Sequence, residues 1–424
     1  MGSTKFIMMI AYLFPPLGGS GALRPLKIAK HLPLHGWTPI VLTVRNPDWY
    51  YARDSALLRE LSAEVIIENS CMLKAAWIYK AFNPFRVGRM DKIIKEYLMH
   101  PDEAIGWLPF AYFKALQLAK RYDIKAVYST SGPLTSHLIA YSLNRRTGIP
   151  WVADFRDEWF EDPALTMPTR IHRRLHYALE SRIVRKADRI IAMAPAFNAL
   201  LKKHDLNHDK FSTLYGGYDL DDIVGDVKEA RKHRQAGRLI ITFTGLFYST
   251  FKPNVLIQTI NDLIESGQIE RGTITLRFVG ANRLEDLDVD DKYGICEMTG
   301  FVPRTESIQY MLGSDLLLLL LSRQRGRDVI PSKLFEYMAS GVPILALVPQ
   351  NGSAAEMIRR SETGYVVDYE DREGTKNTLL ALYRQWRSHR CIEYTPNDDE
   401  VRKYDQRILM DELARILDEM TLSH

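Results

Sequence analysis

The stretch VIPSKLFEYMASGVPILA, residues 329–346, decides the fold of the second half of the chain. Pro331 followed by Ser332 predicts the start of a helix, and Gly341 followed by Pro343 predicts its end. The helix between them therefore has about two to three turns and leads into a new apolar strand. A short helix placed between strands in this way is typical of an α/β sheet.

The start of this helix combines hydrogen-bond donors that suit an anion with a carboxylate that suits neutral hydroxyl groups. Its first backbone N–H groups, near Ser332, Lys333 and Leu334, have no intrahelical partner and favour a negative charge. Glu336 stands next to them and, being negative itself, is suited to accepting hydrogen bonds from ribose hydroxyls. We interpret the stretch as a holder of a nucleoside diphosphate; a surface helix with a solvated glutamate is the alternative.

The composition is that of an ordinary soluble globular protein. The chain has 424 residues, of which 46% are hydrophobic and 25% charged, which allows two or three domains. Its three cysteines lie far apart, which argues against a disulfide framework or a zinc site and favours the cytoplasm. The apolar start runs into a glycine loop and is interpreted as a buried strand rather than a signal peptide. No stretch approaches the roughly 18 apolar residues of a membrane span.

Apolar runs of strand length alternate with amphipathic segments, which predicts parallel sheets covered by helices on both faces. Ten such runs are too many for one small domain and indicate two doubly wound halves, separated by the polar stretch 219–238. We expect an N-terminal domain at 1–222, a C-terminal domain at 238–400, and a final helix, 401–424, that packs back towards the first domain. The predicted strands are 5–14, 38–44, 126–131, 151–155, 189–194, 239–245, 274–280, 316–321, 342–347 and 364–369.

A glycine loop follows the first strand, in FPPLGGSGALR, residues 14–24. Gly19 and Gly21 allow the backbone to approach a phosphate, and the next helix points its positive end there. A dinucleotide fingerprint would need a third glycine where Arg24 stands and an acid where the second strand ends in Arg45. NAD binding is therefore disfavoured, and a plain strand–helix turn is the alternative.

Two further candidate positions follow strands of the first half. His137 lies about one turn into a predicted helix, where the helix N-terminus favours the neutral imidazole; a histidine satisfied within the core is the alternative. Asp154, with Arg156 and Asp157, crowds opposite charges at a strand end, which costs desolvation unless the groups are paired or used. A structural ion network is the alternative there.

The second half opens with another glycine turn, FTGLFYSTFK, residues 243–252. Gly245 ends the strand, and Lys252 stands near a helix start, which is a common place for the counter-charge of a phosphate. An exposed lysine is the alternative. The motifs DLDD (219–222) and DLDVDD (286–291) imitate metal-binding patterns but are interpreted as solvated loop acids, so no metal is expected.

Taken together, these segments resemble the family 4 glycosyltransferases with the GT-B fold, especially bacterial enzymes of surface-polysaccharide assembly. The resemblance covers about residues 5–350 and rests on the order of four motifs as well as on each one. The most specific is SKLFEYMASGVPILA, and the others are FPPLGGSGALR, VADFRDEW and YGGYDLDDI.

The resemblance implies two Rossmann-like domains facing across a cleft, with a nucleotide-sugar donor on the C-terminal domain and the acceptor on the N-terminal one. It implies transfer with retention, without a metal or cofactor, from a donor of the UDP or GDP type to a glycan or lipid-linked acceptor. By resemblance, Glu336 holds the donor ribose, Lys252 lies on the diphosphate and His137 lies near the donor sugar. Asp154 or the leaving phosphate could take the acceptor's proton.

Two positions depart from the family pattern. The acid that contacts the sugar falls at Asp328, which is one methylene shorter than the family's glutamate. The family's arginine near the glycine turn is Leu246 here. The diphosphate then has to rely on helix N–H groups and on the cations Lys252, Lys333, Arg323 or Arg325.

Two other functions fit the same architecture. A nucleotide-sugar 2-epimerase needs acid–base groups on the sugar, and the chain offers no clear set of carboxylates for that task. An inactive GT-B binding or partner subunit would keep the fold and tolerate the two departures.

Charge is unevenly distributed. Residues 1–220 hold 30 Lys and Arg against 20 Asp and Glu, but these cations are scattered among acids, which disfavours nucleic acid. The segment 71–100 mixes cations with aromatic residues, as suits an anionic membrane surface or a lipid-linked acceptor. A peripheral location on the inner face of the cell membrane follows; a solvated helix pair with inward-facing aromatics is equally open. The residues concerned are Lys74, Trp77, Tyr79, Lys80, Phe82, Phe85, Arg86, Arg89, Lys92, Lys95 and Tyr97.

Overall fold

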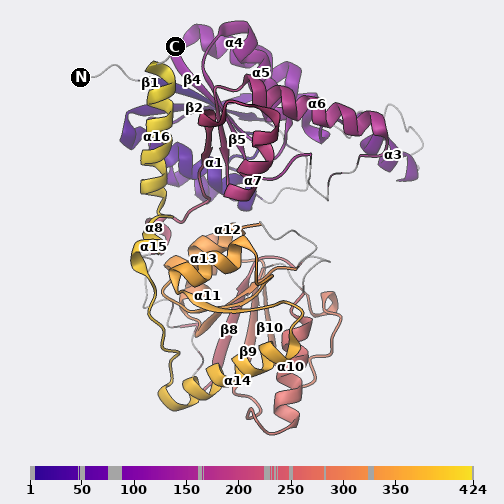
Figure 1. Ribbon diagram of the computed structural model, residues 1–424, viewed down its shortest axis with the longest axis vertical. Helices are drawn as coiled ribbons and strands as arrows, with labels where there is room; N and C mark the ends of the chain where they lie inside the picture. The colour runs from indigo at the N-terminus through magenta and orange to yellow at the C-terminus, as the bar shows by residue number, and fades with distance from the viewer. Residues whose placement is uncertain are drawn as a thin grey trace. The chain divides into compact units, whose positions relative to one another are not determined.

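The computed structural model separates the chain into two compact units, shown in Figure 1. One unit is Met1–Tyr215 with Arg407–His424, and the other is Gly216–Gln406. The expected boundary at 222 therefore lies inside the second unit, and the expected final segment 401–424 is divided between the two. The structure describes residues 5–45, 47, 53–74, 88–160, 165, 167–223, 230, 232–233, 235, 237–247, 252–280, 283–322 and 329–422, without the side chains of 20 and 88–92.

The first unit is built on a seven-stranded parallel sheet in the order β3-β2-β1-β4-β5-β6-β7. The chain moves outward from β1 to β3 and restarts on the other side of β1 with β4. The order reverses there, which makes the carboxyl ends of β1 and β4 the topological switch point. The strands are β1 (Lys5–Ile10), β2 (Trp37–Val44), β3 (Ile66–Ser70), β4 (Ile124–Thr130), β5 (Trp151–Phe155), β6 (Arg189–Ala192) and β7 (Phe211–Thr213).

Helices cover this sheet, and the last helix of the chain is one of them. Leu409, Leu413 and Leu417 of α16 recur every four residues, which places them on one helix face. They are buried in the same core cluster as Ile7 and Met9 of β1. The main helices of the unit are α1 (Ser20–His31), α3 (Gly88–Leu98), α4 (Leu108–Arg121), α5 (Thr135–Thr147), α6 (Arg170–Lys186), α7 (Pro195–Leu201) and α16 (Gln406–Leu422).

The second unit is built on a six-stranded parallel sheet in the order β10-β9-β8-β11-β12-β13. Its central strand β11 consists of leucines, all buried, because a parallel strand with helices on both faces has no solvent side. The order reverses between β8 and β11, which is the switch point of this sheet. The strands are β8 (Leu239–Thr244), β9 (Ile274–Val279), β10 (Cys296–Gly300), β11 (Leu316–Leu320), β12 (Ile344–Leu347) and β13 (Gly364–Val367).

The helices of the second unit include the predicted short helix at 332. It is α12, which begins after Pro331 and ends before Gly341, whose φ of 69° is in the left-handed region. The start and stop signals are therefore confirmed. The helices are α8 (Leu220–Ile223), α10 (Asn254–Glu265), α11 (Arg304–Leu312), α12 (Ser332–Ala339), α13 (Ser353–Ser361), α14 (Arg372–His389) and α15 (Asp398–Arg402).

All ten predicted strands are present, with small differences at their ends. Three strands, β3, β7 and β10, were not predicted, and each lies at the edge of its sheet. Their sequences, IIENS, FST and CEMTG, are short and carry polar residues. An edge strand is covered on fewer sides, so its sequence needs no continuous apolar run.

Within the described residues, no helix is long and apolar enough to cross a membrane. Most of the basic and aromatic side chains predicted to meet a membrane, between 75 and 92, lie outside what the structure describes. Lys95 is described and pairs with Glu103.

The packing of α16 predicts the effect of a core truncation. Leu413→Ala should destabilise the first unit by about 2–5 kcal/mol, because Leu413 is fully buried and the lost contacts leave a cavity. Ile408→Ala on the same helix is the control, since Ile408 is 48% exposed. Thermal unfolding of both variants measures the difference; equal losses would show that α16 does not complete this core.

Candidate functional site

The candidate donor site of the second unit lies at the switch point of its sheet, where β8 and β11 are neighbours. Ligands of open α/β sheets bind at the carboxyl ends of strands at such a point. Gly245 follows β8 directly, and α12 follows β11 along the chain. Three residues between β11 and α12 were also predicted to contribute. These residues, Asp328, Arg323 and Arg325, lie outside the described residues.

Gly245 and Lys333 occupy the same small space at the end of β8. Gly245 has a φ of 114°, and a Cβ on it would lie 2.8 Å from Lys333 Nζ. The Lys333 ammonium donates a hydrogen bond to the Thr244 carbonyl and lies 3.9 Å from the centroid of the Phe243 ring. The backbone conformation therefore favours glycine here, and the Lys333 side chain lies in the space that a Cβ would take.

Tyr337 fixes α12 to the same strand end. The Thr244 backbone N–H donates to the Tyr337 hydroxyl at 2.9 Å, and the Thr244 hydroxyl lies 3.0 Å from it. Burial raises the pKa of Tyr337 to about 12, so the phenol stays neutral. Lys333 and Tyr337 together hold the first turns of α12 against the end of β8.

Glu336 is paired with an arginine that sequence reasoning missed. Arg304, at the start of α11, places a guanidinium nitrogen 2.7 Å from Glu336 Oε1 and 2.8 Å from Asp222 Oδ2. Burial alone would lower the pKa of Arg304, but the two carboxylates outweigh it and raise that pKa. A carboxylate has about four acceptor positions, so this contact leaves Glu336 able to accept from hydroxyls.

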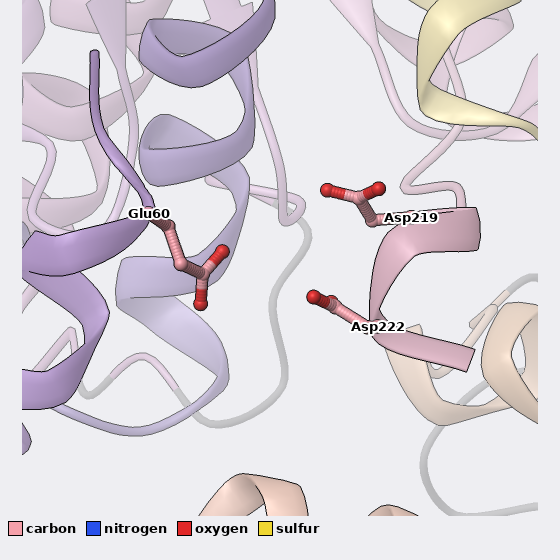
Figure 2. Close-up of side chains that lie close together, drawn as sticks. All are labelled: Glu60, Asp219 and Asp222. Carbon is pink, nitrogen blue, oxygen red and sulfur yellow. The ribbon is translucent and has the colours of Figure 1, made fainter. Parts of the chain in front are cut away.

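Two of the three acids of DLDD, Asp219 and Asp222, are not the solvated loop acids expected from the sequence, whereas Asp221 is exposed. Asp219 is only 2% exposed, and its carboxylate accepts from the Asp221 backbone N–H and caps α8. Asp222 pairs with Arg304. Figure 2 shows both side chains, Asp222 on α8 and Asp219 directly before it, and it also draws Glu60 of the first unit, whose carboxylate pairs with Lys27 at 2.6 Å.

Two predicted phosphate contacts are already engaged. The Leu334 backbone N–H donates to the Pro331 carbonyl at 2.9 Å, so it is not the free donor that the sequence suggested. Lys252 Nζ lies 2.9 Å from Asp288, whose pKa it lowers. Ser332 begins α12 as expected, and Leu246 is exposed. The roles of Ser332, Lys333 and Lys252 towards a diphosphate stay predictions.

In the first unit, Asp154 is the centre of a buried ion network. Arg24 donates to both carboxylate oxygens, from Nε at 2.8 Å and from a terminal nitrogen at 2.7 Å. The hydroxyls of Tyr128 and Thr130 donate to Oδ2 at 2.5 and 2.9 Å. Arg24 also donates to the carbonyls of residues 214 and 215, so the network joins α1, β4, β5 and the end of the unit.

This network makes Asp154 a poor base. Burial would raise the pKa of Asp154, but Arg24 and the two hydroxyls outweigh it and lower that pKa. A general base needs a pKa near the working pH and an unoccupied lone pair. The geometry thus favours the structural ion network, which was the alternative for this position.

His137 is fully buried on α5. Trp151 Nε1 donates to the Ser129 hydroxyl at 2.8 Å, and the same hydroxyl lies 2.8 Å from His137 Nδ1. The other ring nitrogen, Nε2, has no partner within the described residues. Burial lowers the pKa of His137 to about 3 and keeps it neutral. With no exposed surface, its contact with a donor sugar stays a prediction.

Of the two glycines predicted in the loop, Gly19 directly precedes α1 and Gly21 lies in its first turn. Gly19 has a φ of 87° just before α1, which favours glycine, and Gly21 leaves room for the Leu13 side chain. Arg156 donates from a terminal nitrogen to the Gly21 carbonyl at 2.7 Å, and its backbone N–H donates to the Ser131 hydroxyl. Burial lowers the pKa of Arg156. The end of β5 thus supports the loop directly.

The sequence contains features that could have indicated the roles of two arginines, Arg304 and Arg24, which were not predicted. Arg304 is the first residue of α11, where the helix dipole disfavours a cation, so a compensating acid was to be expected. Arg24 stands where a dinucleotide fold has its third glycine, and a large cation there needs a partner. What the sequence did not give was the identity of the partners, which come from distant segments.

Two family models match the chain in succession. The "Glycosyl transferase 4-like domain" matches residues 24–217, and "Glycosyl transferases group 1" matches residues 238–385. The chain is a glycosyltransferase. Between them the two matches leave out residues 218–237, which belong to the second unit and precede β8. No curated protein matches the chain significantly.

Solved structures share the fold of this glycosyltransferase, which is GT-B. Anabaena HepE in complex with UDP is 14% identical with a TM-score of 0.66, over 98% of this chain and 100% of that one. Sucrose-phosphate synthase from Thermosynechococcus elongatus is 13% identical with a TM-score of 0.68, over 99% and 100%. A UDP-forming trehalose-phosphate synthase from Burkholderia xenovorans is 13% identical with a TM-score of 0.63, over 98% and 99%.

The Asp154 network predicts a pH-dependent loss of stability in this glycosyltransferase. Asp154→Asn leaves Arg24 buried without its counter-charge and should cost about 3–5 kcal/mol at neutral pH. Because the pKa of Asp154 in the folded protein lies below the 3.8 of an unperturbed aspartate, its contribution is present above about pH 4 and is lost as the pH falls further. The difference in melting temperature between variant and parent should therefore shrink below about pH 4.

Asp157→Asn is the matched control, since Asp157 lies in the same motif and is exposed. It should leave the melting temperature nearly unchanged. A loss of equal size in both variants would contradict a buried pair centred on Asp154.

Proposed function

We propose that the chain is a retaining, metal-independent family 4 glycosyltransferase that uses a nucleotide-sugar donor of the UDP or GDP type. The acceptor is a hydroxyl of a glycan or of a lipid-linked glycan, as in the assembly of bacterial surface polysaccharides. The observation that carries the proposal is Glu336, held by Arg304 near the start of α12 beside the switch point of β8 and β11.

The geometry of α12 supports a nucleoside diphosphate at this place. Glu336 would accept from the ribose hydroxyls, and the Arg304 guanidinium holds that carboxylate in place. The Lys333 ammonium, at the Gly245 turn, and the start of α12 supply positive charge for the phosphates. Lys252 would exchange Asp288, which is 71% exposed along its side chain, for the diphosphate.

The transfer step needs positioning and charge stabilisation rather than a covalent nucleophile. The bond between the sugar's anomeric carbon and the diphosphate oxygen breaks, and the acceptor oxygen bonds to the same face of that carbon. Negative charge develops on the leaving diphosphate, where Lys333, Lys252 and the helix start would stabilise it.

The acceptor's proton goes to the leaving diphosphate in this proposal. Asp154 was the other candidate, but its oxygens already accept four hydrogen bonds and its pKa is lowered. His137, neutral and buried, would contribute through its Nε2 only if the donor sugar reached it, because its other ring nitrogen already contacts Ser129.

Turnover of labelled nucleotide sugars, with and without acceptor, tests the function. A transferase gives a glycosylated product only with acceptor, a 2-epimerase converts the sugar without one, and an inactive binding subunit gives no product. A thermal-shift comparison of UDP, GDP and TDP with their sugars selects the donor, because binding to the folded state raises the melting temperature. HepE, whose fold is shared, is described in complex with UDP and with UDP-glucose.

Replacing the ribose-holding acid should cripple donor use. Glu336→Ala removes two charge-assisted hydrogen bonds, each worth about 1.5–3 kcal/mol, which corresponds to a loss of roughly two to four orders of magnitude in kcat/KM. Because Glu336 also pairs with Arg304, some stability is lost as well. Kinetics with the selected donor and thermal unfolding measure the two effects.

Asp222→Asn separates these effects, because it weakens the other ion pair of Arg304 and leaves Glu336 in place. This control should lose similar stability and keep kcat/KM within a few-fold of the parent. If the two variants lost activity equally, Glu336 would act only through Arg304, and α12 would not hold the ribose.

Turnover should persist in EDTA. Several acids of the two Asp-rich motifs are engaged by the protein itself: Asp219 caps α8, Asp222 pairs with Arg304, and Asp288 pairs with Lys252. Asp291 accepts from the backbone N–H groups of residues 295 and 296. Initial rates before and after chelation give the answer, and activity that disappears in EDTA and returns with Mn²⁺ would refute metal independence.

A further inference from the structure

One helix of the first unit presents a face that is both apolar and basic. Ile171 of α6 is 75% exposed, and Leu175, four residues later, is 43% exposed. Ala178 and Arg182 continue the same face at helical spacing and are exposed as well. The opposite face of α6 is buried through His176, Glu180, Ser181, Ile183 and Val184.

The charge of α6 is almost entirely positive. Its only acid, Glu180, is buried and lies 2.7 Å from His204, so it does not face solvent. Among the described residues, neither Arg174 nor Arg182 pairs with a carboxylate, and both are exposed. The basic residues of the helix are Arg170, Arg173, Arg174, Arg182, Arg185 and Lys186.

The end of α3 extends this face. His172 Nε2 lies 3.2 Å from the Tyr97 carbonyl, and His100 Nδ1 lies 2.8 Å from His176 Nε2, so α3 is fixed to α6 where α6 begins (Figure 1). Tyr97 and Leu98 of α3 are exposed beside this junction. The exposed apolar side chains thus come from two helices that hold each other in place.

We infer that α6 and the adjoining end of α3 form a docking surface for an anionic lipid bilayer, with α6 lying in the plane of the headgroups. Ile171, Leu175 and Tyr97 would enter the boundary with the acyl chains, and the arginines would reach the headgroup phosphates while their stems lie along the apolar layer. The apolar residues are interleaved with cations instead of forming one uncharged groove, which fits a lipid interface better than a second protein surface.

This surface is centred on α6, and it shares only the end of α3, with Tyr97 and Leu98, with the surface predicted from the sequence over the segment 71–100. The inference rests on the proposed function only for the reason why membrane binding is useful, namely that a lipid-linked acceptor lies at a membrane. Binding to vesicles needs neither donor nor acceptor, so it is measured independently of transfer.

Vesicle flotation of the full chain tests the inference, with phosphatidylcholine vesicles compared with vesicles that also contain phosphatidylglycerol. The protein should float with the anionic vesicles only, and less so as salt screens the charges. A cation near an anionic surface contributes about fivefold in partitioning, so Arg174→Gln with Arg182→Gln should weaken binding roughly 25-fold. Ile171→Gln with Leu175→Gln should also abolish flotation.

Matched controls lie on other helices of the same unit. Arg145→Gln with Arg146→Gln removes the same charge from the exposed end of α5, and Ile408→Gln with Leu422→Gln removes exposed apolar residues from α16. Both controls should bind within about twofold of the parent, and the melting temperature of every variant checks its fold.

Three results would overturn the inference: equal binding to neutral and anionic vesicles, equal losses in the α6 and α5 charge variants, or no flotation at all. A dimer in sedimentation that Ile171→Gln with Leu175→Gln dissociates would show that a second copy covers this face instead. A thermal shift with UDP or GDP distinguishes the proposals, because it reports on the donor site whether or not the protein binds vesicles.

Discussion

The first unit depends on the buried ion pair between Arg24 and Asp154. The pair joins α1 to the ends of β4 and β5, and Arg24 also holds the carbonyls where the chain leaves the unit. A buried pair of this kind contributes little net stability compared with apolar residues, but it is costly to break because one charge would remain unpaired. The glycine loop keeps its place because the helix behind it cannot shift without separating these charges.

The second unit repeats this arrangement around Arg304, with a different result. Arg24 and two hydroxyl groups together donate four hydrogen bonds to the Asp154 carboxylate, which leaves its oxygens poorly placed to accept a proton from a substrate. Arg304 shares itself between Asp222 and Glu336, each partly exposed, so Glu336 is held in place and still has lone pairs to offer. Two acids that look equally suited to function in the sequence therefore differ in what their partners leave free.

Helix and strand positions that depend on local sequence signals were predicted correctly. The partners of charged residues, which come from distant parts of the chain, were not. Pro331 and Gly341 gave the bounds of α12, and continuous apolar runs gave the ten strands that pack most deeply. The environment of Glu336 depends on Arg304 and Asp222, which come from two other helices, and no periodicity in the chain connects them. For the same reason Asp219 and Asp222 were interpreted as solvated, although a cap and an ion pair bury them. Strands β3, β7 and β10 were missed because their polar residues interrupt the apolar pattern.

Those polar residues on the edge strands have a consequence for solubility. Glu68 of β3 pairs with Lys114 at 2.8 Å, and Glu297 of β10 pairs with Arg277 at 2.9 Å, so two of the outermost strands carry a charge held by their own unit. A further strand from another molecule would have to bury that charge in order to add to the sheet, and this opposes aggregation through the edges. Apolar substitutions at Glu68 or Glu297 would make these strands easier to recognise from sequence, and would also make the protein more prone to polymerise.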